Sequence, residues 1–475
     1  MYYALKTDCY FRHYGSVGHL IRPITDTEMV LNDSGALFVE QLDYIPHSLE
    51  EIVNKLINYY NDADKAALFN DAEELFDMLV KDGFLDSAES KQSFNPSSFN
   101  YSTLSGKTSI KAIKSQLEEP SSHYLREYFK NAPFLESFHI ELISKCNERC
   151  VHCYIPHENK TTEINPDLMM SVLAQCKEMG VLTVVFSGGE PMLHRNFCDF
   201  LRQAKDYDLN VTVLSNLTLL NEQIVQALKY RHASCVNVSL YSMDPDVHDS
   251  VTTVKGSFYK TRDNIIKLIE NNIPVQINCP VMKQNKDSFD GVIKWGQDHK
   301  CSVVTDYLIM ARCDRTTDNL ENRLTEEDLQ SVISRYISAD IIAQSRLQMG
   351  HTVKEKLLLN PDESVCGVAM STLCMVANGD CYPCAGWQKY VCGNLQNTKL
   401  EEIWKNSPAL ERLRRLRQKD FKQCLQCADY DYCHMCIARN SNEDPNGDYF
   451  NIPEITCQAA HIQHQTIIEH LSKIG

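Results

Sequence analysis

The chain has 475 residues and a formal net charge of −16, and 43% of its residues are hydrophobic and 23% charged. These proportions are typical of a folded globular protein, and the length predicts two to four domains. The acidic balance argues against a nucleic-acid partner, because proteins that grip phosphate backbones usually carry a basic stripe. The apolar runs are too short to cross a bilayer, and the N-terminus lacks the pattern of a signal peptide. We therefore expect a cytoplasmic protein with no membrane partner.

The pattern of strand-like and helical segments in residues 1–86 predicts a small winged-helix-like domain. Strand-like residues gather in three short runs, around Tyr10, Leu20 and Val30. Three helical patterns follow: the first passes through Leu42, the second opens with a capping box at Ser48, and the third stops at Gly83. Three strands before three helices form a winged-helix arrangement, which can also bind DNA. The many acidic residues of this unit argue against DNA.

The next stretch, residues 87–134, is rich in serine and asparagine and is predicted to be a linker, with a helical pattern at 110–117. From 135 to 345 strand and helix patterns alternate. Strands are predicted at 138–143, 182–186, 210–214, 235–240, 275–280 and 302–308, and helices near 165–179, 196–207, 219–231, 257–271 and 286–299. This alternation predicts an α/β fold, a partial (β/α)6 relative of the TIM barrel. Functional residues in such folds gather at the C-terminal strand ends.

Cysteine is the most informative residue type, with 20 copies in the chain. In a chain without a signal peptide, this number indicates metal binding or redox chemistry rather than disulfides. Three cysteines lie at 146–153, and ten lie between 366 and 457. We interpret the seven scattered ones as small buried hydrophobic residues: Cys9, Cys176, Cys198, Cys235, Cys279, Cys301 and Cys313.

The first cysteine group, Cys146, Cys150 and Cys153, directly follows the first predicted barrel strand. Three thiolates fit three irons of a 4Fe–4S cube and leave the fourth iron without a protein ligand. The alternative is a zinc site, for which His152 or His157 could supply a fourth ligand.

The second predicted strand ends in a glycine motif, made of Ser187, Gly188, Gly189, Glu190 and Pro191. Glycines let the backbone approach a ligand closely, and the Glu190 carboxylate can receive an ammonium group. Together with the cysteine group and the aromatic His152 before its third cysteine, this motif resembles the radical S-adenosylmethionine superfamily. The resemblance implies that the cofactor's amino and carboxylate groups chelate the open iron and that the glycine motif binds the amino group. Reduction of the cluster would then release a 5′-deoxyadenosyl radical.

The resemblance extends along the barrel and implies four further cofactor-binding residues, Tyr154, Ser215, Asn216 and Ser239. The family usually has Asp-Gly shortly after the serine of the fourth strand, whereas this chain has Tyr241-Ser242-Met243. Any one of these polar positions could instead cap a helix.

In residues 346–475, Cys366 is followed by twelve residues, Gly379, four residues and Cys384, and later by two CxxC pairs and Cys457. CxxC pairs alone would also suit a zinc ribbon. The complete pattern resembles the SPASM domain, an extension that binds two auxiliary 4Fe–4S clusters, although the family commonly has one more residue inside the last pair. The resemblance implies an outer cluster held by Cys424, Cys427, Cys433 and Cys457. It implies an inner cluster held by Cys366, Cys384 and Cys436, with Cys374 as fourth ligand, although Cys381 or an open site remain alternatives.

The N-terminal unit resembles a precursor-peptide recognition element, which adds the leader of a ribosomally made peptide as an extra strand. Over most of its length outside the linker, the chain resembles a maturase of ribosomally made peptides. The motifs Ser371-Thr372-Leu373-Cys374 and Cys433-His434-Met435-Cys436 resemble clostridial maturases of Cys-rich peptides, which form the thioethers of sactipeptides and ranthipeptides. The resemblance implies a peptide-modifying oxidoreductase with three 4Fe–4S clusters, S-adenosylmethionine, a Cys-rich precursor peptide and an electron donor such as flavodoxin or ferredoxin. Carbon–carbon crosslinking, epimerisation and a non-catalytic zinc-binding regulator are the alternatives. No catalytic acid or base is identified, because the radical removes the hydrogen.

Overall fold

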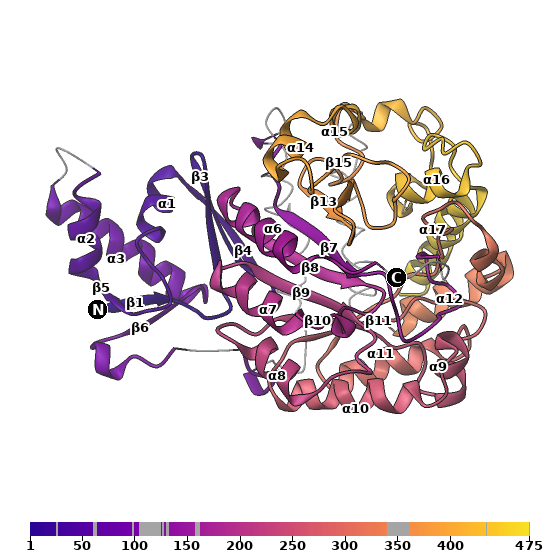
Figure 1. Ribbon diagram of the computed structural model, residues 1–475, viewed down its shortest axis with the longest axis horizontal. Coiled ribbons are helices and arrows are strands. Elements are labelled where there is room, and N and C mark those ends of the chain that lie inside the picture. Colours follow the sequence, from indigo (N-terminus) through magenta and orange to yellow (C-terminus); the bar gives the residue numbers. More distant parts are fainter. Residues whose placement is uncertain are drawn as a thin grey trace.

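The structure is a computed structural model that describes residues 1–24, 27–59, 64–96, 99–103, 125, 128–129, 133–156, 162–339, 361–433 and 435–474. A small N-terminal domain lies at one end of a central α/β unit, and a Cys-rich C-terminal part packs on the other side (Figure 1). The predicted helix at 110–117 and His157 lie outside the described residues. No helix within the described ranges is long and apolar enough to cross a membrane.

The N-terminal domain contains the three strands and three helices predicted for it. Its elements are β1 (Tyr2–Leu5), β2 (Tyr10–Tyr14), β3 (Val17–Arg22), β4 (Thr27–Asn32), α1 (Asp33–Val39), β5 (His47–Ser48), α2 (Leu49–Leu56), α3 (Lys65–Lys81) and β6 (Leu85–Ala88). The capping box at Ser48 is confirmed, with Glu51 as its partner. The short strands β1, β5 and β6 were not predicted, because two to four residues carry little alternating pattern. They form one sheet, and β2, β3 and β4 form another.

The N-terminal domain is attached to the barrel through Asp208. This carboxylate accepts hydrogen bonds from Arg12 Nη1 at 3.0 Å and from the Tyr44 hydroxyl at 2.7 Å. The Tyr14 hydroxyl also donates to the Gly180 carbonyl, at 3.1 Å. Since Arg12 and Tyr14 belong to β2, this strand faces the barrel, while β4 lies at the opposite edge of its sheet.

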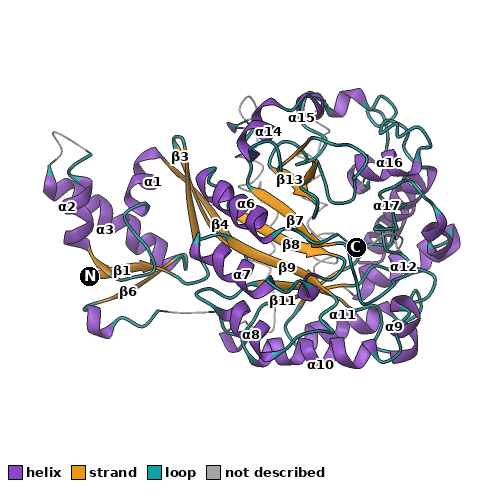
Figure 2. Cartoon of the chain, viewed as in Figure 1, coloured by secondary structure: helices purple, strands orange, loops and turns teal. Residues whose placement is uncertain are grey.

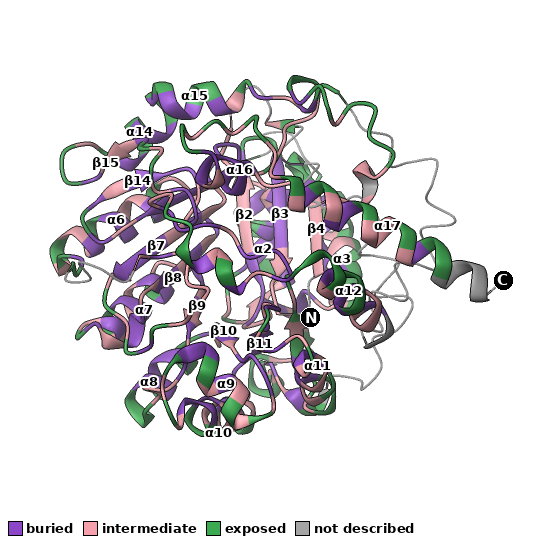
Figure 3. Ribbon diagram, turned by 90° about the vertical axis from the view of Figure 1, so that its right-hand side faces the viewer, coloured by how far each residue is buried: buried purple, intermediate pink, exposed green. Residues whose placement is uncertain are grey.

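The central unit is the predicted barrel, with six parallel strands in the order in which they occur. The strands are β7 (Ser137–Ile143), β8 (Thr183–Gly188), β9 (Asn210–Ser215), β10 (Cys235–Ser239), β11 (Val275–Asn278) and β12 (Ser302–Val304). The helices are α6 (Pro166–Glu178), α7 (Phe197–Asp206), α8 (Glu222–Lys229), α9 (Pro245–Thr252), α10 (Ser257–Glu270), α11 (Phe289–Asp298) and α12 (Glu326–Ala339). Figure 2 shows the helices outside the strands, and Figure 3 shows that the strands are mostly buried.

Several features of the barrel differ from the expectation. Helices α9 and α12 were not predicted. β12 ends at Val304, four residues before the predicted end, although backbone hydrogen bonds to the neighbouring segment continue as far as Asp306. Part of the predicted linker is packed on the barrel rather than separate from it. Tyr101 is buried, its hydroxyl donates to the Ile273 carbonyl at 3.3 Å, and the Val275 amide donates back to that hydroxyl at 2.9 Å.

The C-terminal part continues the barrel sheet. β13 (Thr372–Met375) pairs in parallel with β7, and β14 (Asp380–Tyr382) and β15 (Gly393–Asn394) extend the sheet to nine strands. Four helices follow: α14 (Leu400–Asn406), α15 (Pro408–Arg414), α16 (Ile437–Glu443) and α17 (Glu454–Ile474). The register places Cys374 opposite His139 of the first barrel strand. The Cys-rich segment is therefore built directly onto the barrel wall.

Candidate active site

The glycine motif fits tightly against the loop that carries the first cysteine. Gly188 has a φ of +131°, and a Cβ added there would lie 2.2 Å from the Ile143 carbonyl oxygen. A Cβ on Gly189 would lie 2.2 Å from the Lys145 carbonyl oxygen. The backbone amides of Gly189 and Glu190 donate to these two carbonyls, at 2.7 and 2.9 Å. The glycines thus let the end of β8 hold the backbone immediately before Cys146, a contact that the sequence pattern did not indicate.

Glu190 organises the neighbouring strand ends. Its carboxylate is fully buried and accepts hydrogen bonds from the Ser215 hydroxyl at 2.8 Å, the Asn216 amide at 2.9 Å and the Met192 amide at 3.0 Å. Burial raises the pKa of Glu190 to about 7, against the lowering effect of these hydrogen bonds. The Asn216 side chain in turn lies 3.8 Å from Cys146 Sγ. The predicted motif residues Glu190, Ser215 and Asn216 are therefore brought together beside the first cysteine.

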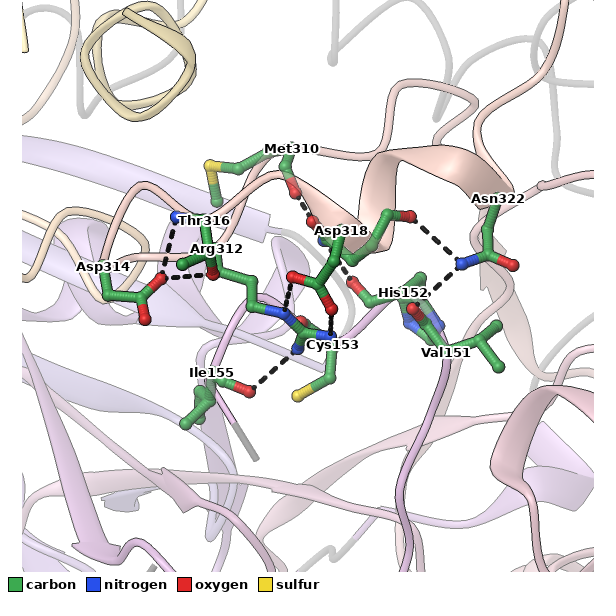
Figure 4. Close-up of polar contacts among 11 residues, drawn as sticks. Val151, His152, Cys153, Ile155, Met310, Arg312, Asp314, Thr316, Asp318 and Asn322 are labelled. Atoms are coloured by element: carbon green, nitrogen blue, oxygen red, sulfur yellow. Dashed lines mark hydrogen bonds and ion pairs between the residues drawn. The ribbon is translucent and has the colours of Figure 1, made fainter. Parts of the chain in front are cut away.

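The other end of the cysteine loop is held by the segment that follows β12 (Figure 4). Arg312 forms two hydrogen bonds with Asp318, at 2.8 and 2.7 Å, and donates a third to the Cys153 carbonyl at 2.8 Å. Asn319 donates to the His152 carbonyl at 3.2 Å, and Asn322 donates to the Val151 carbonyl at 3.2 Å. These contacts fix the loop through its backbone carbonyls rather than through its cysteine side chains.

Two residues beside Cys150 were missed by sequence reasoning. The Tyr241 hydroxyl donates to Cys150 Sγ at 3.6 Å, and Glu148 Oε2 lies 3.7 Å from the same sulfur. Glu148 is 3% exposed, and its other carboxylate oxygen has no hydrogen-bond partner within the described residues. Burial raises the pKa of Glu148 to about 8 and raises the pKa of the Cys150 thiol well above its ordinary value. Tyr241 stands where the sequence departs from the family pattern, whereas nothing distinguished Glu148 from a surface acid.

The remaining predicted cofactor-binding residues line the same region. Ser187 is the last residue but one of β8 and contacts the ring of His139 across the strand pair. Ser239 ends β10, two residues before Tyr241. Tyr154 is partly exposed; its hydroxyl donates to Glu141 at 3.5 Å, and its carbonyl accepts from the Cys313 amide at 2.8 Å. Burial raises the pKa of Tyr154 well above its ordinary value.

The four cysteines predicted for the outer cluster lie near one another. Cys424 and Cys433 are partly buried, while Cys427 and Cys457 are exposed. Burial, together with the neighbouring thiols of Cys433, Cys427 and Cys457, raises the pKa of Cys424 to about 11. None of the twenty cysteines, all of which lie within the described ranges, is joined in a disulfide. A group of four neighbouring thiols fits cationic iron, which holds cysteine as the thiolate.

The cysteines predicted for the inner cluster are less uniformly arranged. Burial and the neighbouring Cys436 raise the pKa of Cys384, which places these two side chains close together. Cys366 is exposed, whereas Cys374 is buried and within 4.8 Å of ligand atoms of His139 and Glu141. Of the seven scattered cysteines interpreted as buried, five are buried and two, Cys198 and Cys235, are partly exposed.

Three family models match successive parts of this fold. Residues 140–296 match the radical SAM superfamily, residues 366–429 match the iron–sulfur cluster-binding domain named SPASM, and residues 20–85 match coenzyme PQQ synthesis protein D. The chain is therefore a radical S-adenosylmethionine enzyme that carries a SPASM domain and an N-terminal precursor-recognition domain. This combination is that of the radical SAM/SPASM peptide maturases, as expected from the sequence.

Two relatives match about two thirds of this chain. The chain is 24% identical over 342 residues to an AdoMet-dependent heme synthase of Nitratidesulfovibrio vulgaris, covering 68% of this chain and 93% of the relative. It is 26% identical to the antilisterial bacteriocin subtilosin biosynthesis protein AlbA of Bacillus subtilis, covering 64% of this chain and 67% of that protein. The fold is similar to Streptococcus suis SuiB bound to precursor peptide SuiA, with a TM-score of 0.59, 17% identity, and coverage of 95% and 99%.

Proposed function

We propose that this enzyme modifies a ribosomally made, Cys-rich precursor peptide and joins a cysteine sulfur to a carbon atom, forming a thioether. The observation that carries the proposal is a recognition domain attached to a radical barrel through Asp208. Such a domain serves a leader peptide, and an enzyme acting on a small metabolite has no use for it. The similarity to the subtilosin biosynthesis protein supports a peptide substrate.

The proposed division of labour follows the domains. Residues 1–86 would bind the leader, 87–134 would connect, 135–345 would form the radical barrel, and 346–475 would hold the auxiliary clusters. We propose that Cys146, Cys150 and Cys153 hold the first 4Fe–4S cluster. The outer auxiliary cluster would use Cys424, Cys427, Cys433 and Cys457. The inner one would use Cys366, Cys384 and Cys436, with its fourth position open or taken by Cys374 or Cys381.

The leader would bind along β4. This strand pairs with β3 on one side, and within the described residues no strand pairs with its other edge. A pocket of about 360 Å³ adjoins it, lined by Ser16, Val17, Val30, Leu31, Asn32 and Tyr128. An extended peptide can add to such an edge through backbone hydrogen bonds, while a pocket accepts one of its side chains. The opposite edge, β2, faces the barrel and is not available.

When bound, S-adenosylmethionine would supply the radical that removes one hydrogen atom from the peptide. The protein's own contribution is positional. The Glu190 carboxylate holds Ser215 and Asn216 at the strand ends, and the segment from Arg312 to Asn322 holds the cysteine loop. The peptide thiol loses its hydrogen as a proton, so formation of the carbon–sulfur bond leaves one surplus electron. An auxiliary cluster is the proposed acceptor of this electron. A flavodoxin or ferredoxin would supply electrons, and a cytoplasmic location would keep the thiols reduced.

The test is anaerobic co-expression with the small Cys-rich peptide encoded nearest to the enzyme, followed by mass measurement before and after thiol alkylation. Thioether formation predicts loss of two hydrogens per crosslink together with loss of alkylatable thiols. Loss of two hydrogens with every thiol still reactive would refute it in favour of carbon–carbon crosslinking. In the same assay Cys146→Ala should abolish cofactor cleavage, whereas Cys176→Ala, which changes a buried cysteine of α6, should retain it.

A further inference from the structure

A group of three metal-ligating side chains, of which Glu141 and Cys374 are buried and His139 is partly exposed, joins the first barrel strand to the C-terminal Cys-rich segment. His139 and Glu141 are two residues apart on β7, so their side chains point to the same face. Cys374 of β13 is the register partner of His139, and one ligand atom from each residue lies within 4.8 Å of the others. Phe138 and Ile140, between and beside them, are fully buried in the core on the opposite face.

Neighbouring side chains form hydrogen bonds with this group, as they commonly do around the ligands of a metal site. Gln388 Nε2 donates to Glu141 Oε1 at 2.9 Å, the Tyr154 hydroxyl donates to the same oxygen at 3.5 Å, and the Ser187 hydroxyl contacts His139 Nε2. Contacts of this kind orient ligating side chains and fix the histidine tautomer. Burial lowers the pKa of His139 to about 4, so the ring is neutral at physiological pH, which is the form that binds metals.

We propose that His139, Glu141 and Cys374 bind one zinc ion, whose open fourth position takes a cysteine thiol of the peptide substrate. One imidazole, one carboxylate and one thiolate suit zinc by ligand type. Three protein ligands leave one coordination position for a substrate atom. A thiol that binds there gives its proton to water as the zinc–sulfur bond forms, since a coordinated thiol is deprotonated. The part concerning the thiol rests on the proposed function, whereas the metal site does not.

The position of the site suits this role. Tyr154, which contacts Glu141, directly follows Cys153 of the first cysteine group. Gln388, which contacts the same carboxylate, lies four residues after Cys384 of the inner group. Glu141 therefore lies between the loops that carry the two groups. The assignment also removes Cys374 from the inner cluster and leaves that cluster with Cys366, Cys384, Cys436 and one open iron.

The first experiment measures zinc and iron in the anaerobically purified full chain. We expect one zinc per chain in addition to the cluster iron. His139→Gln and Cys374→Ala should each lose the zinc and keep the iron, and Cys176→Ala, a buried cysteine on α6, should keep both. Absence of zinc from iron-loaded wild type supplied with zinc would overturn the proposal. Loss of iron rather than zinc in Cys374→Ala would also overturn it, and would make Cys374 a cluster ligand.

The second experiment is zinc-edge X-ray absorption of the same protein, which does not depend on turnover. Without peptide we expect one sulfur at about 2.3 Å and nitrogen or oxygen ligands at about 2.0–2.2 Å. Addition of the Cys-rich peptide should raise the sulfur count to two, and its all-serine variant should not. An unchanged sulfur count would overturn the thiol assignment. If the peptide thiols stay reactive in the alkylation assay while the zinc signals are as expected, the proposed thioether chemistry fails and the metal site stands.

Discussion

Replacing Glu190 by glutamine tests the arrangement of the strand ends, because it removes the charge and keeps the shape. In the wild type, Oε1 accepts from the Met192 amide and the Ser215 hydroxyl, and Oε2 accepts from the Asn216 amide. Glutamine has one acceptor oxygen. Its best orientation keeps the two bonds at Oε1 and turns its NH2 group toward the Asn216 amide, so that a buried donor loses its partner. Leaving one buried group unsatisfied costs about 1–3 kcal/mol.

The charge gives this prediction a pH dependence. Burial raises the pKa of Glu190 to about 7 from an ordinary value of 4.5. Between these pH values the folded protein holds more protons than the unfolded chain, so the free energy of unfolding falls as pH rises. At up to 1.36 kcal/mol per pH unit, the wild type loses about 2 kcal/mol from this group between pH 5.5 and pH 8. Glutamine does not ionise. The variant should therefore be less stable than wild type at pH 5.5 and about equally stable at pH 8.

The assay is urea unfolding of the iron-loaded protein at both pH values without added S-adenosylmethionine, with Glu178→Gln as control. Glu178 is exposed at the end of α6, so its variant should follow the wild type at both pH values. A constant difference between wild type and Glu190→Gln at the two pH values would refute the assigned ionisation. Equal stability at pH 5.5 would refute the hydrogen-bond argument. Binding of the cationic cofactor should tighten with rising pH in the wild type and not in the variant.

Three further changes have defined outcomes. Gly189→Ala would push a Cβ against the Lys145 carbonyl. Overpacking of this kind costs about 1–3 kcal/mol and should displace the cysteine loop. Iron analysis should then show the loss of about four irons, those of the first cluster, while the iron of the auxiliary clusters is retained. Lys205→Met leaves three buried carbonyls without the amino group that binds them at 2.6–3.1 Å. The unfolding midpoint should fall by the equivalent of about 2–4 kcal/mol. The control variant Lys229→Met, which changes an exposed lysine, should leave the midpoint unchanged. Asp208→Asn weakens the attachment of the N-terminal domain. Limited proteolysis should release that domain faster from the variant than from the wild type, while cofactor cleavage is unchanged. Release at the same rate from both proteins would contradict the attachment through Asp208.

Local patterns were enough to predict much of this site. The first cysteine group, the glycine motif and Ser215-Asn216 each occupy a few consecutive residues at the end of a strand, where a parallel sheet brings them to one edge. The structure places Glu190, Ser215, Asn216 and Cys146 together there. Similarly, the six barrel strands were predicted from short apolar runs that alternate with helical patterns. The capping box at Ser48 was predicted from a signal of four residues.

The contacts that sequence reasoning missed join residues far apart in the chain. Arg312 holds the Cys153 carbonyl across 159 positions, and Gln388 reaches Glu141 across 247. Nothing within either segment marks these residues, because their function depends on a partner in another element. The same reason explains Glu148, whose burial beside Cys150 is a property of the packed loop.

The sequence by itself determined the kind of chemistry, since cysteine spacing and strand-end motifs are short-range properties that survive in the linear order of residues. The neighbours of Cys374 were decided only by tertiary structure. Its position in the cysteine pattern predicts a cluster ligand, and the pairing of β13 with β7, which places it opposite His139, is the basis of the proposed zinc site. Strand pairing between residues more than two hundred positions apart depends on the packing of the whole sheet. That is why the group formed by His139, Glu141 and Cys374 has no signature in the sequence.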